Sequence, residues 1–259
     1  MKKFFKVCCI LFFALLIVIL TGAAYLNYIG SHSNPNNYKK IAEIPAPNGY
    51  EQVPLTQGSF GNFLRNLPLK PKDSKIKLYK GEVAGLQFLG YAIVDIPLIS
   101  NDEQCADVCM RLWAEYLYNK GLYNKISFTN VNGKKMEYQG GNSRKAFKKY
   151  MRSVFGMCNT NSLHRYLKKK SLADLEVGDI FVYPWEGNAY GHAVMVADIA
   201  KNKDGEMAIL CVEGNTPARD IHIIRNPYPF RNAWSFIDKD DSNIVISCFL
   251  FNQKDIRGF

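Results

Sequence analysis

Residues 191–213 read GHAVMVADIAKNKDGEMAILCVE, which is two apolar stretches on either side of a polar one. The first stretch covers 192–200 and the second 206–213, and both are rich in residues that favour strands. Between them, Lys-Asn-Lys-Asp-Gly has the composition of a tight turn. The segment therefore predicts an antiparallel β-hairpin.

The position of the turn also predicts how the two strands pair. If the turn is centred on the polar stretch, the numbers of paired residues sum to about 407. His192 then lies opposite Asn215 and diagonal to Glu213, on the same face of the hairpin. A slip of one residue would place Gly214 and Thr216 there instead, so the register decides which side chain meets the histidine.

Outward from the hairpin, the pattern of apolar residues predicts helices as well as strands, so the fold class is α+β. No internal repeat or low-complexity stretch is present. We expect a short helix at 61–67, a helical segment at 143–166 broken at Gly156 and Asn159, and strands at 75–79, 89–96, 178–183 and 244–251, the last completing the sheet.

The clearest helix follows Ser100, which forms a capping box with Glu103 three residues later. Apolar residues then repeat at intervals of three and four, which predicts one buried face. Cys105 lies near the start of this helix, where unpaired backbone N–H groups and the helix dipole favour a thiolate. The residues that repeat are Cys105, Val108, Cys109, Leu112, Trp113, Tyr116 and Leu117.

These positions suggest a nucleophile and a base. A Cys105 thiolate needs a group to take and return a proton, and His192, behind Gly191 at the head of a strand, is the best placed of the four histidines. Glu213 is the first choice for the residue that orients the imidazole, and Asn215 the second. The alternative reading of Cys105 and His192 is that both are structural residues of the core.

The N-terminus predicts export. Residues 1–6 carry three lysines, and residues 7–26 contain no charge, as in a signal peptide or a signal anchor. We expect residues 1–27 to be that segment, 28–43 a tether, and 44–259 a single domain. The domain would lie outside the cytoplasm, in the periplasm or at the cell surface, either tethered to the plasma membrane or secreted after cleavage.

Composition and motifs limit the classes of ligand and partner that we expect this protein to bind. The first 27 residues hold three of the 33 basic and none of the 23 acidic residues, so the remainder carries +7. Its basic residues are scattered, apart from Lys168-Lys169-Lys170 and the stretch from Arg144 to Arg152, which argues against nucleic acid as a partner. No phosphate-binding loop, serine-hydrolase elbow or histidine pair at metal-ligand spacing occurs, so we expect no cofactor and no metal. Five cysteines lie beyond the segment, and this odd number leaves at least one thiol without a partner in the chain.

Two segments carry a resemblance to known families. Residues 175–182 (Leu-Glu-Val-Gly-Asp-Ile-Phe-Val) and 191–197 (Gly-His-Ala-Val-Met-Val-Ala) resemble the Gly-Asp and Gly-His strands of papain-like cell-wall hydrolases, the NlpC/P60 and CHAP groups. These are peptidoglycan amidases and endopeptidases that use a cysteine, a histidine and a third polar residue in that order. The resemblance implies a papain-like fold, a helix packed on an antiparallel sheet, with Cys105, His192 and either Glu213 or Asn215 in the three roles. Where those families usually have Asp-Cys-Ser-Gly, this chain has Gln104-Cys-Ala-Asp.

Over nearly all of its exported length, the chain also resembles a bacterial family known only as domain of unknown function 4846, a likeness that implies no activity. The segments that carry it are Gly58-Ser-Phe-Gly, Leu64-Arg-Asn-Leu-Pro-Leu, Gln104-Cys-Ala-Asp, Arg111-Leu-Trp-Ala-Glu-Tyr-Leu-Tyr and Gly191-His-Ala-Val.

Two functions follow as expectations. As an enzyme, the protein would cleave a peptide or amide bond, most naturally in peptidoglycan or another envelope peptide, with the Cys105 backbone N–H and Gln104 holding the oxyanion. As a non-catalytic binding module of the cell envelope, it would use a cleft lined by Trp185, Tyr190 and Trp234. Gln104, Asn215, Tyr190 and Trp185 are the expected substrate-binding residues in the first case.

Overall fold

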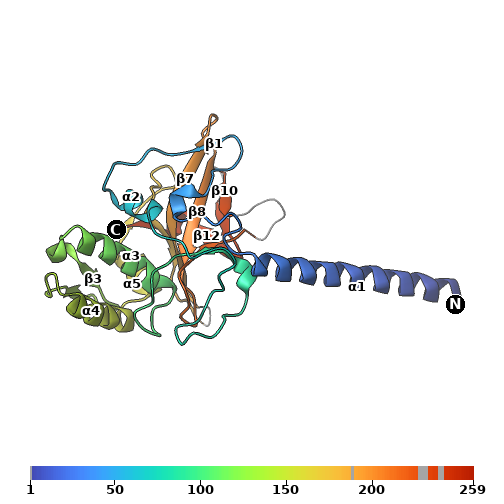
Figure 1. Cartoon of the computed structure of the whole chain (residues 1–259), viewed down its shortest axis with the longest axis horizontal. Helices are drawn as coiled ribbons and strands as arrows, with labels where there is room; N and C mark the ends of the chain where they lie inside the picture. Colours follow the sequence, from blue (N-terminus) through green and yellow to red (C-terminus); the bar gives the residue numbers. More distant parts are fainter. Residues whose placement is uncertain (1, 188–189, 227–232, 239–241) are drawn as a thin grey trace.

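The structure is a computed structural model of the 259-residue chain. It describes residues 2–187, 190–226, 233–238 and 242–259 (Figure 1). The helices are α1 (Lys2–Ser31), α2 (Phe60–Arg65), α3 (Cys105–Asn119), α4 (Arg144–Met157) and α5 (Thr160–Tyr166), with single 3-10 turns at Ile41–Glu43, Gln87–Leu89, Tyr123–Lys125 and Gln253–Asp255.

The strands confirm an α+β fold built on a large antiparallel sheet. They are β1 (Tyr50–Gln52), β2 (Gly90–Ile93), β3 (Ser127–Thr129), β4 (Lys135–Glu137), β5 (Lys168–Lys169), β6 (Ile180–Tyr183), β7 (His192–Asn202), β8 (Met207–Glu213), β9 (His222–Ile224), β10 (Trp234–Ile237), β11 (Asn243–Ile246), β12 (Phe249–Asn252) and β13 (Ile256–Gly258). Within the described residues, the main sheet has the order β2-β9-β8-β7-β6-β13-β5, with β1 also paired to β7 and β10 to β8.

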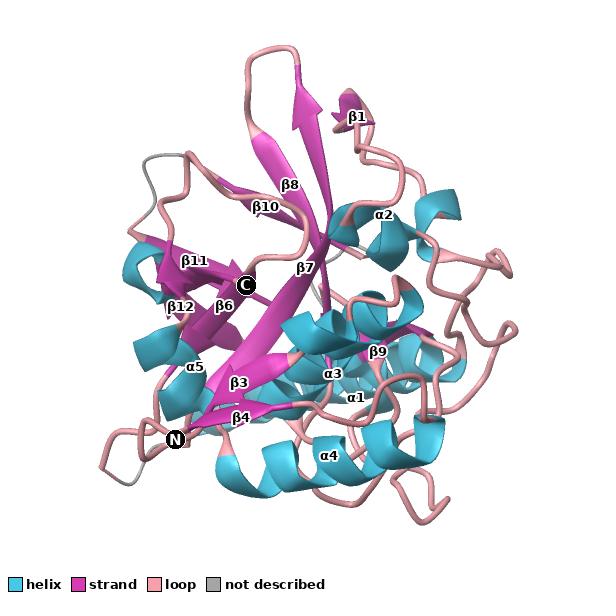
Figure 2. Cartoon of the chain, turned by 90° about the vertical axis from the view of Figure 1, so that its left-hand side faces the viewer, coloured by secondary structure: helices cyan, strands magenta, loops and turns pink. Residues whose placement is uncertain are grey.

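The predicted hairpin is the pair β7–β8 at the centre of this sheet (Figure 2). Met195 pairs with Val212 and Val196 with Cys211, which is the predicted register. The register then shifts by one residue before Asp198, and pairing continues toward the turn. The register that matters for the histidine is therefore confirmed, because the shift lies on the turn side of it.

Two apolar cores form because neighbouring residues of a strand point to opposite faces of the sheet. On one face, Met195 and Leu210 pack with side chains of α2, α3, α4 and α5, including Leu112 and Phe147. On the other face, strand residues such as Val194 pack with the β11–β12 hairpin and with β13. Helix α3 is thereby held against β7 and β8, and its first residue lies near one end of these strands.

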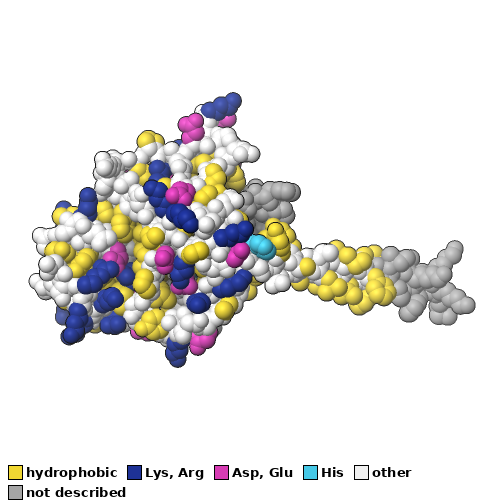
Figure 3. Space-filling model, viewed as in Figure 1, with side chains coloured by type: hydrophobic (Ala, Val, Ile, Leu, Met, Phe, Trp, Pro, Cys, Tyr) yellow, Lys and Arg dark blue, Asp and Glu magenta, His cyan; other side chains and the backbone are white. Residues whose placement is uncertain are grey.

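Helix α1 extends away from the body of the protein as a long rod (Figure 1). Its segment Leu11–Ser31 is long and apolar enough to cross a membrane, with a mean hydropathy of 2.0. Exposed hydrophobic side chains lie along the described part of this rod (Figure 3). The helix therefore fits a signal peptide or a membrane anchor.

Residues 28–43, predicted as a tether, are fastened to the domain. The backbone N–H of Asn34 donates to Tyr91 O over 2.6 Å, and the Arg225 guanidinium donates to His32 O over 3.1 Å. Asn34 and Ile41 are fully buried. The apolar helix therefore joins the domain through a packed segment, and α1 continues to Ser31 rather than ending at residue 27.

Two expectations about individual elements were wrong. Gly156 does not break the helical segment, because α4 continues through it to Met157. The break is at Asn159, as predicted, where the side chain caps α5 by accepting from the N–H groups of Asn161 and Ser162. Residues 75–79 do not form a strand but make single bridges, from Lys77 to Val83 and from Leu78 to Arg219.

The strand predicted at 244–251 was also wrong. It is a hairpin, β11–β12, which pairs with itself and forms a separate two-stranded sheet. Its turn is Ser247-Cys248, and Ser247 has a positive φ of 56°. Ser247 is the one polar residue between Ile244 and Phe251, so the apolar pattern gave little sign of the reversal.

Candidate functional site

Cys105 is the first residue of α3, and the preceding residue, Gln104, is the N-cap. The Asp107 carboxylate accepts from the Gln104 N–H over 3.0 Å. The capping residues are therefore Gln104 and Asp107, and the expectation of a capping box at Ser100 and Glu103 was wrong. Those two residues form a turn before the helix, in which the Glu103 N–H donates to Ser100 O over 3.3 Å.

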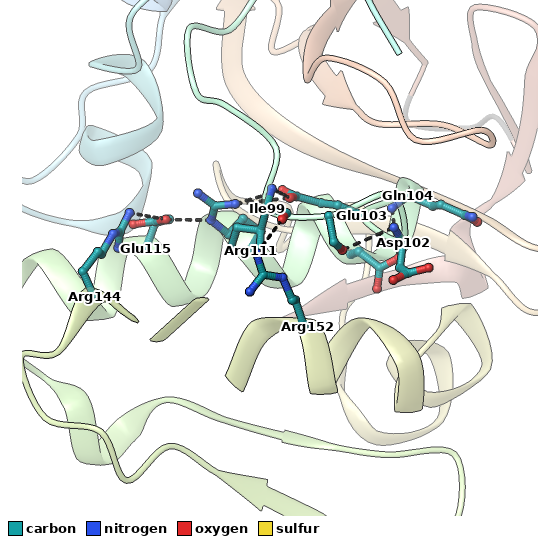
Figure 4. Close-up of polar contacts among 10 residues, drawn as sticks. Ile99, Asp102, Glu103, Gln104, Arg111, Glu115, Arg144 and Arg152 are labelled. Carbon is teal, nitrogen blue, oxygen red and sulfur yellow. Dashed lines mark hydrogen bonds and ion pairs between the residues drawn. The ribbon is translucent and has the colours of Figure 1, made fainter. Parts of the chain in front are cut away.

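A buried ion cluster holds this turn against the body of α3 (Figure 4). Arg111 lies 3.2 Å from the Glu103 carboxylate and 2.6 Å from Glu115, which also pairs with Arg144. The Glu103 carboxylate in turn accepts from the Ile99 N–H over 2.6 Å. Burial raises the pKa of Glu103 to about 6 in spite of the Arg111 charge. The cluster thus fixes the backbone that leads into Cys105.

His192 is the first residue of β7 and is buried. Its Nε2 lies 2.8 Å from Glu213 Oε2, which leaves Nδ1 as the nitrogen available to Cys105. Burial lowers the pKa of His192, but hydrogen bonds and charge interactions with Cys105 and Glu213 outweigh burial and raise the pKa to about 9. The structure therefore brings the three predicted residues together.

Glu213 is the last residue of β8 and is almost fully buried. Burial raises the pKa of its carboxyl, but hydrogen bonds from His192 and His222 prevail and lower the pKa to about 2. A buried carboxylate is stable only when its oxygens are satisfied, and here each oxygen faces an imidazole. Glu213 rather than Asn215 is therefore the partner of His192.

His222, in β9, is a site residue that the sequence reasoning missed. It lies directly opposite Glu213 in the β8–β9 ladder, with Nε2 3.2 Å from Glu213 Oε1 and Nδ1 3.0 Å from Asp220 O. The available signal was the short apolar segment 221–224 (Ile-His-Ile-Ile). Both imidazoles lie at hydrogen-bond distance from the carboxylate, and among the described residues no cluster is arranged to hold a metal ion.

An aromatic ring covers the histidine. The Phe249 ring, next to the β11–β12 turn, stacks on the His192 ring with centroids 3.7 Å apart and planes 17° apart. Only 8% of Cys105 and 5% of His192 are exposed. Phe249 thus excludes water from one face of the imidazole, which strengthens the hydrogen bond to Glu213.

Two glycines allow the strand ends and the helix to meet. A Cβ on Gly191 would lie against Thr160 Oγ1 and only 2.7 Å from Tyr183 O, so no other residue fits before His192. A Cβ on Gly214 would lie 2.6 Å from a methyl group of Val108 in α3. The Gly-His pattern is therefore a packing requirement that brings the histidine close to α5 and the end of β6.

The predicted polar binding residues lie beside this site. The Gln104 side-chain oxygen accepts from the Thr216 hydroxyl over 2.8 Å, which ties the start of α3 to the loop after β8. The Asn215 side chain accepts from the Thr216 N–H over 2.8 Å. Asn215 is therefore engaged with its own loop, two residues after Glu213.

The predicted aromatic residues divide into two groups. Trp185 and Tyr190 are 50% and 75% exposed, with ring centroids 4.7 Å apart, close to Gly191. Trp234 is buried, and its indole N–H donates to Pro45 O over 2.9 Å. A cleft lined by all three was therefore a wrong expectation, because Trp234 belongs to the core.

The Gly178-Asp179 pair shapes the turn before β6. Gly178 has a φ of +105° and lies against the Phe60 ring, where a side chain would clash. The Asp179 carboxylate accepts from Lys170 Nζ and from the Glu176 N–H, each over 2.7 Å. These residues lie on the turn that leads into β6.

A cavity of about 430 Å³ is lined by residues of α2, by residues 175–177 and by the part of β7 near its turn with β8. Cys105 is not among the residues that line it.

Burial affects the four other thiols that follow α1. Within the described part of the chain after residue 31, all five cysteines are free. Burial raises the pKa of Cys109 and of Cys211, and it raises that of Cys158 to about 11. Burial also raises the pKa of Cys248, which lies at the exposed hairpin tip. Each of these four is therefore held in the less reactive thiol form at neutral pH.

Comparison with known proteins identifies a family. The family model described as "Domain of unknown function (4846)" matches residues 41–142 and 139–258. These two segments include Cys105, His192, Glu213 and His222. No curated protein and no solved structure matches the chain.

Proposed function

Because this chain belongs to the family described as domain of unknown function (4846), a description that names no activity, we propose its function from the site. It is an exported cysteine hydrolase that cleaves a peptide or amide bond, with peptidoglycan as substrate. Its catalytic residues are Cys105, His192 and Glu213, on a papain-like fold of the NlpC/P60 or CHAP type.

The proposal rests on one observation. His192 interacts both with Cys105, the first residue of a helix, and with the buried carboxylate of Glu213. The helix terminus and a protonated His192 both favour the thiolate of Cys105. Glu213 lies 2.8 Å from the far nitrogen of the ring, so it holds the imidazole in one orientation and stabilises its positive charge. The chain order of cysteine, histidine and third residue is that of the papain-like families.

In the first step, the Cys105 thiolate attacks the carbonyl carbon of the scissile bond. The carbonyl oxygen becomes an oxyanion and accepts from the Cys105 backbone N–H, which is unpaired at the helix start. His192 gives its proton to the leaving nitrogen as the C–N bond breaks. A thioester on Cys105 and a free amine result.

In the second step, water attacks the thioester carbonyl while His192 takes one of its protons. The C–S bond breaks, and the carboxylic acid product leaves. The Cys105 thiolate and the imidazolium are restored. Glu213 stays ionised throughout, because its role is to stabilise the charged imidazole.

The substrate class is proposed from where the domain would lie. An apolar N-terminal helix and the likeness to wall hydrolases favour a substrate in the cell envelope. The exposed pair Trp185 and Tyr190 provides flat apolar surface beside the site, on which a glycopeptide can pack. The net charge of +7 after residue 27 favours an anionic polymer at low salt.

A second function is favoured by one feature, the low exposure of Cys105 and His192. If the site stayed closed, the protein would be a non-catalytic envelope-binding module on the same fold. Trp185 and Tyr190 would then contact the ligand, and Cys105 would be a structural thiol.

The test uses the full-length protein in detergent under reducing conditions, with purified muropeptides as substrate. Wild type is compared with Cys105→Ala, His192→Ala and Cys248→Ala, and new amino groups are measured. We expect release by wild type and by Cys248→Ala, the matched thiol control near the site. We expect loss by at least about 10³-fold in the other two.

Folding of each variant is checked by circular dichroism. If wild type and Cys105→Ala are equally silent yet bind the same muropeptide equally well, the binding-module function is correct. Activity retained by folded Cys105→Ala would also contradict the proposal.

A further inference from the structure

The second imidazole on Glu213 has no part in the chemistry proposed above. His222 is 2% exposed, and each of its ring nitrogens faces an oxygen: Nε2 faces Glu213 Oε1 at 3.2 Å and Nδ1 faces Asp220 O at 3.0 Å. A backbone carbonyl and an ionised carboxylate are both acceptors. The ring therefore lies between two groups that only accept hydrogen bonds.

This arrangement limits the hydrogen bonds that the His222 ring can make. A neutral imidazole has one N–H, so one of the two contacts would press a nitrogen lone pair against an oxygen lone pair. A ring with both nitrogens protonated donates to both oxygens and carries a positive charge. With a Cys105 thiolate, the buried row of side chains Cys105, His192, Glu213 and His222 then carries charges of alternating sign, and its net charge is zero.

The shared carboxylate sets how strongly His192 holds its proton. A histidine paired with a carboxylate of its own is a strong base and releases its proton slowly. Because Glu213 Oε1 is engaged by His222, the negative charge that His192 experiences through Oε2 is partly neutralised. A proton on His192 is therefore easier to transfer to a leaving amine.

We propose that His222 is a positioning residue that orients Glu213 and shares its charge, so that His192 can act as an acid as well as a base. The inference rests on the proposed function for its catalytic meaning, but the protonation it assigns is independent of any substrate. Besides Cys105, other titratable groups interact with the Glu213 carboxylate from the elements packed around it: Tyr183 of β6, Cys211 of β8, Arg219 of the loop before β9 and Cys248 of the hairpin turn.

The first test reads protonation directly. The chain has four histidines, so ¹⁵N-labelling of histidine in the full-length protein in micelles gives few signals, which single substitutions assign. At neutral pH, His222 is expected to show both ring nitrogens protonated. A neutral tautomer of His222 in the folded protein would overturn the inference, and this state is read in wild type once substitutions of the other three histidines have assigned the signals.

The second test is the titration of His192 in His222→Gln, compared with His164→Gln as a distant control. Glutamine can donate to Glu213 but brings no charge, so we expect the His192 midpoint to rise by about one pH unit. A merely structural role for His222 predicts an unchanged midpoint, and that result would overturn the proposal. His164→Gln should leave the midpoint where it is.

The outcomes separate this inference from the proposed function. If muropeptides are not cleaved but the midpoint of His192 rises in His222→Gln, the charge sharing stands and the hydrolase function fails. If muropeptides are cleaved but the midpoint does not move, the hydrolase stands and His222 is structural. If His222→Gln does not fold, the protonation state of wild type decides the question.

Discussion

His192 links the chemistry of the site to the stability of the protein. Its pKa is raised to about 9, so folding favours the protonated ring over the ring in the unfolded chain, whose pKa is about 6.5. The protonated His192 ring therefore stabilises the folded state, and this stabilisation is complete below about pH 6.5 and is lost as the pH rises through 9. A shift of this size corresponds to about 3 kcal/mol.

We therefore expect the free energy of unfolding of wild type to fall by about 3 kcal/mol more than that of His192→Gln between pH 6 and pH 9.5. Urea denaturation of both proteins in detergent measures it. The variant serves as the control, because the other thiols that lose protons over this range are present in both. Parallel curves for the two proteins would show that His192 has no raised pKa.

The residues of the site differ in how far sequence alone predicts them. Glu213 follows from the turn position, because a hairpin with a known turn has only one register that puts the acid beside His192. His222 does not follow, because residues 214–221 have no regular pattern that fixes where pairing resumes. Phe249 does not follow either, since its position over the imidazole depends on a hairpin packed from the far end of the chain.

At the scale of a single element, the position of the start of α3 depends on the ion cluster around Arg111. Replacing Arg111 with Met would leave Glu103 buried without its cation, and we expect a loss of about 3–5 kcal/mol at pH 7. The loss should be smaller at pH 5, where Glu103 is neutralised more easily. Chemical denaturation at both pH values measures this difference. An equal loss at both would mean that packing, not charge, explains the effect.

The contact between α3 and the end of β8 gives a second prediction. Gly214→Ala would push Val108 and the start of α3 away, so we expect a loss of about 1–3 kcal/mol and slower alkylation of Cys105. Gly156→Ala is the matched control, because nothing lies within 4 Å of its added Cβ inside α4. That control should gain about 0.5–1 kcal/mol. Unchanged Cys105 reactivity in Gly214→Ala would show that the contact does not position the thiol.

At this scale, the long elements could be predicted, and so could the short elements α2, β2 and β6, but several other short strands could not. α3 and the β7–β8 pair carry several turns or residues of regular pattern, which is enough to identify them. β9, β10 and β13 have three or four residues each and were not predicted. They exist because the edges of β8 and β6 pair with them, and such pairing depends on parts of the chain distant in sequence.

For the whole molecule, the fastening of residues 28–43 means that the domain is attached directly to the end of α1. We expect the domain to lie outside the cytoplasm. A maleimide that cannot cross the plasma membrane should then modify the exposed Cys248 in intact spheroplasts. Labelling only after the membrane is dissolved would contradict this topology, and a cytoplasmic cysteine protein is the control for leakage.

The central claim is that Cys105 and His192 form a thiolate–imidazolium pair held by Glu213. It is tested most directly by the rate at which iodoacetamide alkylates each cysteine of the full-length protein between pH 5 and pH 9, followed by peptide mass spectrometry. Cys105 should react fastest, and in wild type its rate should stay nearly constant down to about pH 6. In His192→Ala the rate should fall about tenfold per pH unit below pH 8, as for an ordinary thiol. A tenfold fall per unit in wild type, or faster reaction at Cys158 or Cys211, would contradict the account.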